Sequence, residues 1–229
     1  MKFGVIIFPA SNCAEDCYYV LSSLLNQNTK YFWHKSSEAI DTDVVILPGG
    51  FSFGDYLRCG AIARFSPVME RVIEFAGKGG LVIGICNGFQ ILTESGLLPG
   101  TLMKNTCLKF ICSPQYLKVE NNYSVFSKKY NSGDVINCPI AHNEGNYFAD
   151  ENTINKLEKN NQILFRYCDE NGNVNDSTNP NGSVNNIAGI INIEGNVLGL
   201  MPHPERSSEK ILLCDDGIKL FKSIIESYN

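Results

Sequence analysis

Residues 80–96 have the sequence GLVIGICNGFQILTESG, in which an apolar run leads directly into a segment with helical spacing. The apolar run at residues 80–85 is typical of a buried strand. We expect a helix to begin at Cys86 or Asn87 and to stop at the turn-forming residues 95–96. The sequence therefore places Cys86 at a strand-to-helix junction.

The flanking sequence repeats this alternation of buried strands and amphipathic helices. It predicts strands at residues 2–8 and 43–47, and helices at residues 14–25 and 67–76. Later segments predict antiparallel strands at residues 107–112, 115–119 and 135–140. We expect a hairpin formed by residues 188–193 and 197–201, and a final helix at residues 211–227. We therefore expect one domain over residues 1–229 with an α/β, flavodoxin-like doubly wound fold. Its sheet would be mostly parallel, with helices on both faces and a small antiparallel excursion.

Residues 169–187, DENGNVNDSTNPNGSVNNI, differ in composition from the rest of the chain. Asn, Gly, Ser and Asp crowd this segment, and these residues favour turns over regular structure. The composition predicts a surface loop or hairpin tip and indicates no function for it.

Composition and charge exclude several classes of function. The 229 residues carry 19 Lys and Arg against 24 Asp and Glu, so a net charge of -5 gives no basic field for nucleic acid or anionic membranes. Nine cysteines with no CxxC pair, and no leader-like sequence after Met1, predict a reducing, cytoplasmic environment. Apolar runs are far shorter than the roughly 20 residues that span a bilayer.

The pentapeptide at residues 84–88, Gly-Ile-Cys-Asn-Gly, has the G-x-nucleophile-x-G form. Such an elbow needs small flanking residues, because the nucleophile has a strained backbone and the adjacent turns crowd together. A thiolate at the start of a helix is favoured by the helix dipole. Cys86 is therefore a candidate nucleophile; the alternative is a buried, inert cysteine in a tight turn.

A candidate base is His203, one of three histidines, in the sequence MPHPER at residues 201–206. Pro204 favours an extended backbone at His203, and in an extended segment residues two apart project to the same side. Glu205 would then orient the imidazole and stabilise its protonated form, as the acid of a catalytic triad does. The alternative is a structural turn histidine.

The glycine-rich loop at residues 47–55, LPGGFSFGD, follows a predicted strand. Backbone N–H groups of Gly49 and Gly50, with that of Asn87, could form an oxyanion hole, although such a loop is more often only a turn. The chain contains no G-x-x-x-x-G-K-[ST] sequence, so we expect no P-loop ATP site in it.

With GICNGFQ at residues 84–90 and HPE at residues 203–205, in the order Cys, His, Glu, the chain resembles the class I, or triad, glutamine amidotransferases. The order separates it from α/β-hydrolases, in which the acid precedes the histidine. Three further segments are PGGFSFGDYLRCGAIAR at residues 48–64, FPASNC at 8–13 and AHNEG at 141–145. In these segments the chain resembles one family within that class, the glutaminase subunits of phosphoribosylformylglycinamidine synthase.

The resemblance implies that Cys86, His203 and Glu205 hydrolyse glutamine through a thioester, and that Gln90 positions the substrate. It also implies that ammonia passes to a large synthetase subunit, which converts formylglycinamide ribonucleotide to its amidine in purine biosynthesis. The resemblance leaves open whether a third small subunit belongs to that complex. ATP and magnesium are expected on that synthetase, and no cofactor or metal in this chain.

The same residues also suit other functions. The rivals are a stand-alone cysteine amidase or peptidase, a redox-protective protein of the related Cys-elbow type, and a catalytically silent interaction subunit. The spacings of Cys13, Cys17, Cys107 and Cys112 fit no zinc ribbon. His142 and Glu144 either bind substrate or partner or belong to a hydrogen-bonded loop.

Overall fold

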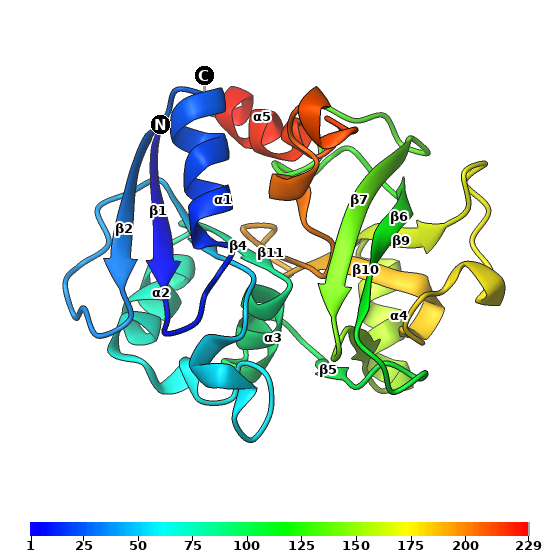
Figure 1. Cartoon of the computed structure of the whole chain (residues 1–229), viewed down its shortest axis with the longest axis horizontal. Helices are drawn as coiled ribbons and strands as arrows, with labels where there is room; N and C mark the ends of the chain where they lie inside the picture. The colour runs from blue at the N-terminus through cyan, green and yellow to red at the C-terminus, as the bar shows by residue number, and fades with distance from the viewer. Residues whose placement is uncertain (229) are drawn as a thin grey trace.

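The computed structural model describes residues 1–228. Within these residues, strands of one large sheet are β1 (Lys2–Ile7), β2 (Asn28–Trp33), β3 (Val44–Leu47), β4 (Leu81–Ile85), β6 (Ile111–Val119), β7 (Val135–His142), β9 (Ile163–Cys168), β10 (Ile187–Ile191) and β11 (Val197–Leu200). Their order across the sheet is β2-β1-β3-β4-β11-β10-β9-β6-β7 (Figure 1). Two short strands, β5 (Thr101–Met103) and β8 (Asn146–Phe148), pair antiparallel in a second sheet.

The large sheet is parallel in one half and antiparallel in the other. The strands from β2 through β1, β3 and β4 to β11 are parallel neighbours. From β11 through β10, β9 and β6 to β7 the neighbours are antiparallel. The predicted α/β class is confirmed, but the sheet is mixed and not mostly parallel. The chain beyond the third helix extends the same sheet with antiparallel strands, so its antiparallel part is larger than the small excursion predicted.

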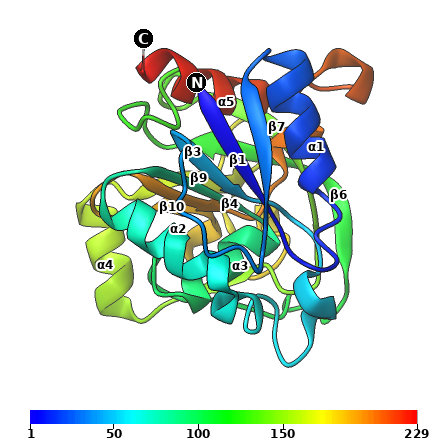
Figure 2. The ribbon, with the colours of Figure 1, turned by 90° about the vertical axis from the view of Figure 1, so that its left-hand side faces the viewer.

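Helices lie on both sides of this sheet. They are α1 (Ala14–Tyr19), which continues as a π-helical turn over Val20–Leu24, α2 (Pro67–Gly77), α3 (Asn87–Glu94), α4 (Glu151–Lys159) and α5 (Ile218–Ser227). Figure 2 shows α2 and α3 on one side and α1 and α5 on the other. None of the helices in residues 1–228 has the length and apolar character needed to cross a membrane.

The central strands form the core. Every residue of β3, β4, β10 and β11 is buried. Strands covered on both faces have unbroken apolar sequences, which is why most of these segments were predictable from the sequence. The edge strand β2 was not predicted, because among its residues only Phe32 is buried.

Three other predicted elements differ in the structure. Residues 107–112 and 115–119 were expected as two strands, but β6 runs unbroken through Pro114, which lies opposite Pro139 of the edge strand β7. The neighbour β9 pairs with β6 only from Tyr116 onward, so no ladder bond is needed from Pro114 on that side. The last helix begins at Ile218 and not at residue 211, because Leu213 has a positive φ of 69° that interrupts the helix.

Candidate active site

Loops from the carboxyl ends of the parallel strands meet at one edge of the sheet. The N–H of Cys13, after β1, donates to the carbonyl of Gly49, after β3, at 3.3 Å. The N–H of Cys86, after β4, donates to the carbonyl of Leu200 at the end of β11, at 2.8 Å. In α/β sheets the crevice outside these strand ends is the usual ligand site.

Cys86 has the strained backbone expected of an elbow. Its φ of 49° and ψ of -103° are unusual for a residue with a side chain, and helix α3 begins at the next residue. A Cβ on Gly88 would lie 1.9 Å from the Leu47 carbonyl oxygen, and one on Gly84 would lie 2.6 Å from Gly88. Both flanking positions therefore require glycine, as the sequence predicted. The Cys86 thiol, which is buried, donates to the carbonyl of Ala141 at 3.6 Å.

His203 and Glu205 project to the same side and form a buried pair. The His203 Nδ1 atom lies 2.6 Å from Glu205 Oε1, and the exposed fractions of the two residues are 1% and 2%. Within residues 1–228, His203 Nε2 and Glu205 Oε2 have no hydrogen-bond partner. The ring therefore donates through Nδ1 and keeps Nε2 for another group.

The environment of His203 favours its protonated form. Burial on its own lowers the pKa of the imidazole, but the Glu205 carboxylate and then Cys86 raise it well above its ordinary value. A partly desolvated site strengthens both interactions. Glu205 and Cys86 are thus the groups that raise the pKa of His203, and the three predicted residues lie in one site.

The predicted glycine loop packs against this pair. A Cβ on Gly49 would lie 2.6 Å from His203 Cε1, so Gly49 contacts the imidazole. Gly50 has a φ of 136°, and a Cβ there would lie 2.7 Å from the Asn12 nitrogen. Gly50 and His203 line a cavity of about 230 Å³, together with Asn12, Cys13, Phe51, Phe110, Cys112, Ala141 and Arg206.

Asn87 and Gln90 use their side chains to connect the surrounding loops. Asn87 Oδ1 accepts from the N–H of Ser52 at 3.2 Å, and Asn87 Nδ2 donates to Gln90 Oε1 at 2.9 Å. Gln90 Nε2 in turn donates to the carbonyl of Glu144 at 2.6 Å. Both side chains are buried, so α3 fixes the glycine loop on one side and the segment after β7 on the other.

The remaining residues of the motifs lie nearby. The Glu144 carboxylate accepts from the N–H of Cys59 at 3.4 Å, and Arg58 forms an ion pair with Glu94 at 2.5 Å. His142 is buried, and burial followed by repulsion from His203 lowers the pKa of its imidazole to about 4. His142 is therefore neutral at neutral pH.

Cys13 and Arg206 are site residues for which the sequence alone gave no role. Arg206 donates to the Cys13 sulfur at 3.0 Å and to Asp16 Oδ2 at 3.3 Å, which ties the HPER segment to the start of α1. Cys13, His203 and Glu205 offer ligand atoms within 4.8 Å of one another, a grouping that could hold a metal ion. The segment containing Cys13 carried part of the family resemblance, but nothing in its spacing pointed to His203.

The chain is similar to known proteins along nearly its whole length. The family described as "CobB/CobQ-like glutamine amidotransferase domain" matches residues 5–214. The chain is 59% identical to the phosphoribosylformylglycinamidine synthase subunit PurQ of Moorella thermoacetica, over 99% of this chain and 96% of the relative. It is 58% identical to the subunit of the same name from Trichormus variabilis, over 99% and 97%.

A solved structure is also similar to this chain over its whole length. The structure of PurLQS from Thermotoga maritima contains a chain with a TM-score of 0.86 and 39% identity, and the match covers 100% of this chain and 99% of that one. The similarity therefore extends over the whole chain in both sequence and structure. The chain belongs to the PurQ family of phosphoribosylformylglycinamidine synthase glutaminase subunits, within the CobB/CobQ-like glutamine amidotransferases.

Proposed function

We propose that Cys86, His203 and Glu205 hydrolyse the side-chain amide of glutamine and that the ammonia is used by a synthetase subunit. That subunit would convert formylglycinamide ribonucleotide to formylglycinamidine ribonucleotide in purine biosynthesis. The observation that carries this proposal is the buried His203–Glu205 bond of 2.6 Å beside Cys86. It provides a base with a fixed tautomer next to a thiol in an elbow.

The chemistry proceeds in two steps. The Cys86 thiol gives its proton to His203 Nε2, and the sulfur forms a bond with the amide carbon. N–H groups of Gly50 and Asn87 stabilise the oxyanion, and the proton passes from His203 to the departing nitrogen as the C–N bond breaks. A glutamyl thioester remains. Water that loses a proton to His203 then attacks it, which releases glutamate and restores the thiol, while Gln90 helps to position the substrate.

The partners follow from the relatives. One similar solved structure is named PurLQS, so we infer a complex with a large synthetase subunit and a third small subunit. ATP and magnesium would act on the synthetase, since this chain has no Walker A sequence. The free cysteines agree with a cytoplasmic location.

We also infer that residues 1–229 form one flavodoxin-like amidotransferase domain. The order β2-β1-β3-β4-β11 of the parallel strands is the flavodoxin-like order, and the family match spans residues 5–214.

The test is Cys86→Ala in the assembled complex. Glutamine-dependent amidine formation should disappear, whereas formation from added ammonium salt should continue, because the synthetase step needs no thiol from this chain. Cys107→Ala, at an exposed thiol outside the site, is the matched control and should retain both activities. Glutamine-dependent turnover by Cys86→Ala would refute the mechanism.

A further inference from the structure

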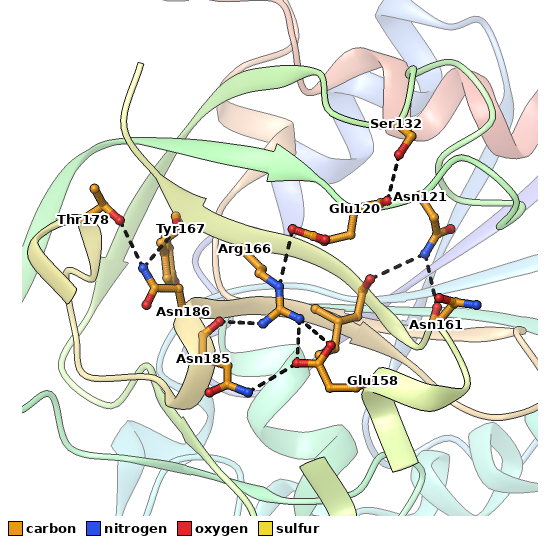
Figure 3. A network of polar contacts seen from close by, with 11 residues as sticks. Glu120, Asn121, Ser132, Glu158, Asn161, Arg166, Tyr167, Thr178, Asn185 and Asn186 are labelled. Atoms are coloured by element: carbon orange, nitrogen blue, oxygen red, sulfur yellow. Dashed lines mark hydrogen bonds and ion pairs between the residues drawn. The ribbon is translucent and has the colours of Figure 1, made fainter. Parts of the chain in front are cut away.

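The asparagine-rich segment at residues 169–187 is held against β9 by hydrogen bonds from side chains of both (Figure 3). Asn186 Nδ2 donates to the carbonyl of Tyr167 and to Thr178 Oγ1, at 3.1 Å each. Arg166 donates to the carbonyl of Asn185 at 2.6 Å. The segment is therefore a surface loop only in part, because its anchored portion turns Asn181 inward, where that residue is 0% exposed.

Asn181 holds the backbone that follows β7. Its Nδ2 atom donates to the carbonyl of Gly145 at 2.8 Å and lies 3.5 Å from His142 Nε2. Its Oδ1 accepts from the N–H of Ser183 at 3.0 Å, which fixes the orientation of the amide. The Ser183 hydroxyl shares its single hydrogen between Asn181 Oδ1 at 2.8 Å and the Gly145 carbonyl at 3.1 Å.

Asn105 holds the same backbone from the opposite side. Its Nδ2 donates to the carbonyls of His142 and Lys109, at 3.0 and 2.9 Å, so its Oδ1 faces the other way. That oxygen accepts from the N–H of Gly145 at 3.0 Å and from His142 Nδ1 at 3.1 Å. One neutral tautomer of His142, with hydrogen on Nδ1 and a lone pair on Nε2, satisfies both asparagines.

The segment that these residues hold, residues 141–145, forms a wall of the active site. The Ala141 carbonyl accepts from the Cys86 thiol at 3.6 Å. The Glu144 carbonyl accepts from the Gln90 side chain at 2.6 Å. The wall therefore contacts both the nucleophile and the residue proposed to position glutamine, and a shift of the wall would move both contacts.

We infer that Asn105, His142 and Asn181 are positioning residues, whose buried network holds the wall at residues 141–145 in register with Cys86 and Gln90 for glutamine binding. The inference rests on the proposed role of Cys86. Buried amides whose donors and acceptors are all used define one geometry, and loss of a single donor leaves a buried carbonyl short of a partner. A displacement of about 1 Å near reacting groups can cost on the order of 10²-fold in rate.

The experiment is Asn181→Ala in the assembled complex. We expect kcat/KM for glutamine to fall about 10- to 100-fold, with a raised KM carrying much of the loss. Ammonia-dependent turnover should not change. The pH dependence of Cys86 alkylation by iodoacetamide should also persist, because the His203–Glu205 hydrogen bond involves none of the three asparagine and histidine residues of the network. Ser183→Ala removes one of two donors to Gly145 and should give a smaller shift in the same direction, which keeps the test valid if Asn181→Ala folds poorly.

Tyr167→Phe is the matched control. The Tyr167 hydroxyl, 3.3 Å from Asn181 Nδ2, shares the second amide hydrogen with His142 Nε2, so its removal perturbs the same buried cluster but spares the bonds to Gly145. It should lower the melting temperature and leave KM for glutamine unchanged. Equal kinetic losses in Tyr167→Phe and Asn181→Ala, or normal glutamine kinetics in Asn181→Ala and Ser183→Ala, would overturn the inference. An active Cys86→Ala would instead overturn the proposed function, so the two failures are distinguishable.

Discussion

Nδ1 of His203 lies 2.6 Å from Oε1 of Glu205, although the two residues are separated in the chain by only one proline. Pro204 begins a 3-10 turn over Pro204–Arg206, and His203 at its N-cap has φ and ψ angles of -104° and 87°. This turn brings the two buried side chains together. A hydrogen bond of this length between an imidazole and a carboxylate is charge-assisted, and it strengthens when the ring is protonated. This relationship supports the transfer of the Cys86 proton to His203.

Replacing the acid by its amide tests that role. In Glu205→Gln the carbonyl oxygen can still accept from Nδ1, but the imidazolium loses its counter-charge. We expect kcat for glutamine hydrolysis to fall by about 10³- to 10⁴-fold with little change in KM, measured in the assembled complex. Glu194→Gln, at an exposed position of the β10–β11 hairpin, should behave as wild type. A defect confined to KM would mean that Glu205 has only a structural role.

A second prediction concerns the oxyanion donor. In Gly50→Ala the new Cβ would lie 2.7 Å from the Asn12 nitrogen at a φ of 136°, so the peptide must rotate away from its position in the cavity. Loss of one oxyanion donor lowers kcat by about 10²- to 10³-fold. Gly54→Asn serves as control, since its φ of 70° suits asparagine and no atom lies within 4 Å of the new Cβ. Similar kcat values for the two variants would exclude Gly50 as a donor.

His142 predicts a pH dependence of stability. Its folded-state pKa of about 4 lies below the unfolded value of 6.5, so between these values the unfolded chain binds more protons and stability falls as pH falls. The loss between pH 7 and pH 5 amounts to about 2 kcal/mol from this residue. His142→Gln, which cannot titrate, should show a correspondingly smaller loss in denaturant titrations at the two pH values. Equal losses in both proteins would contradict the buried, neutral state of His142.

The triad was predictable because each of its parts is encoded locally. A strand-to-helix elbow is visible from the glycines around Cys86, and His203 and Glu205 lie only two residues apart. The predicted pair forms, but the extended backbone expected for it was wrong, because Glu205 lies in a 3-10 turn over Pro204–Arg206. The network around His142 was not predictable in the same way. Asn105 and Asn181 contact His142 from segments 37 and 39 residues away, and an isolated asparagine has no spacing that indicates such a contact.

In the fold too, elements encoded by a local sequence pattern were predictable, and pairings between distant segments were not. The all-buried strands β3 and β4 have unbroken apolar sequences, so their type follows from composition. That β9, β6 and β7 extend the same sheet depends on pairings between distant segments. The helix α4 and the strand β9 were not predicted at all.

Large apolar side chains are exposed around the mouth of the site. Phe51 and Phe110, whose ring centroids lie 6.3 Å apart, line the cavity that contains His203. Tyr56 and Leu57, in the loop that follows Phe51, are 71% and 82% exposed. Exposed apolar side chains beside a polar reaction centre are suited to binding a partner, which would cover the site, exclude water and retain ammonia.

Leu57→Asn should therefore weaken the complex without weakening the fold. Leu57 has a φ of 71°, which asparagine tolerates better than leucine, so the melting temperature should stay the same or rise. A leucine buried at an interface contributes about 1.5–3 kcal/mol, which predicts a Kd for the synthetase raised about tenfold or more, measured by calorimetry. Leu213→Asn is the matched control, because Leu213 is 97% exposed with a φ of 69°. The orange segment before α5 lies at the opposite end of the molecule from the cyan loop before α2 (Figures 1 and 2). If both variants change the Kd equally, or neither does, the synthetase does not dock over Leu57.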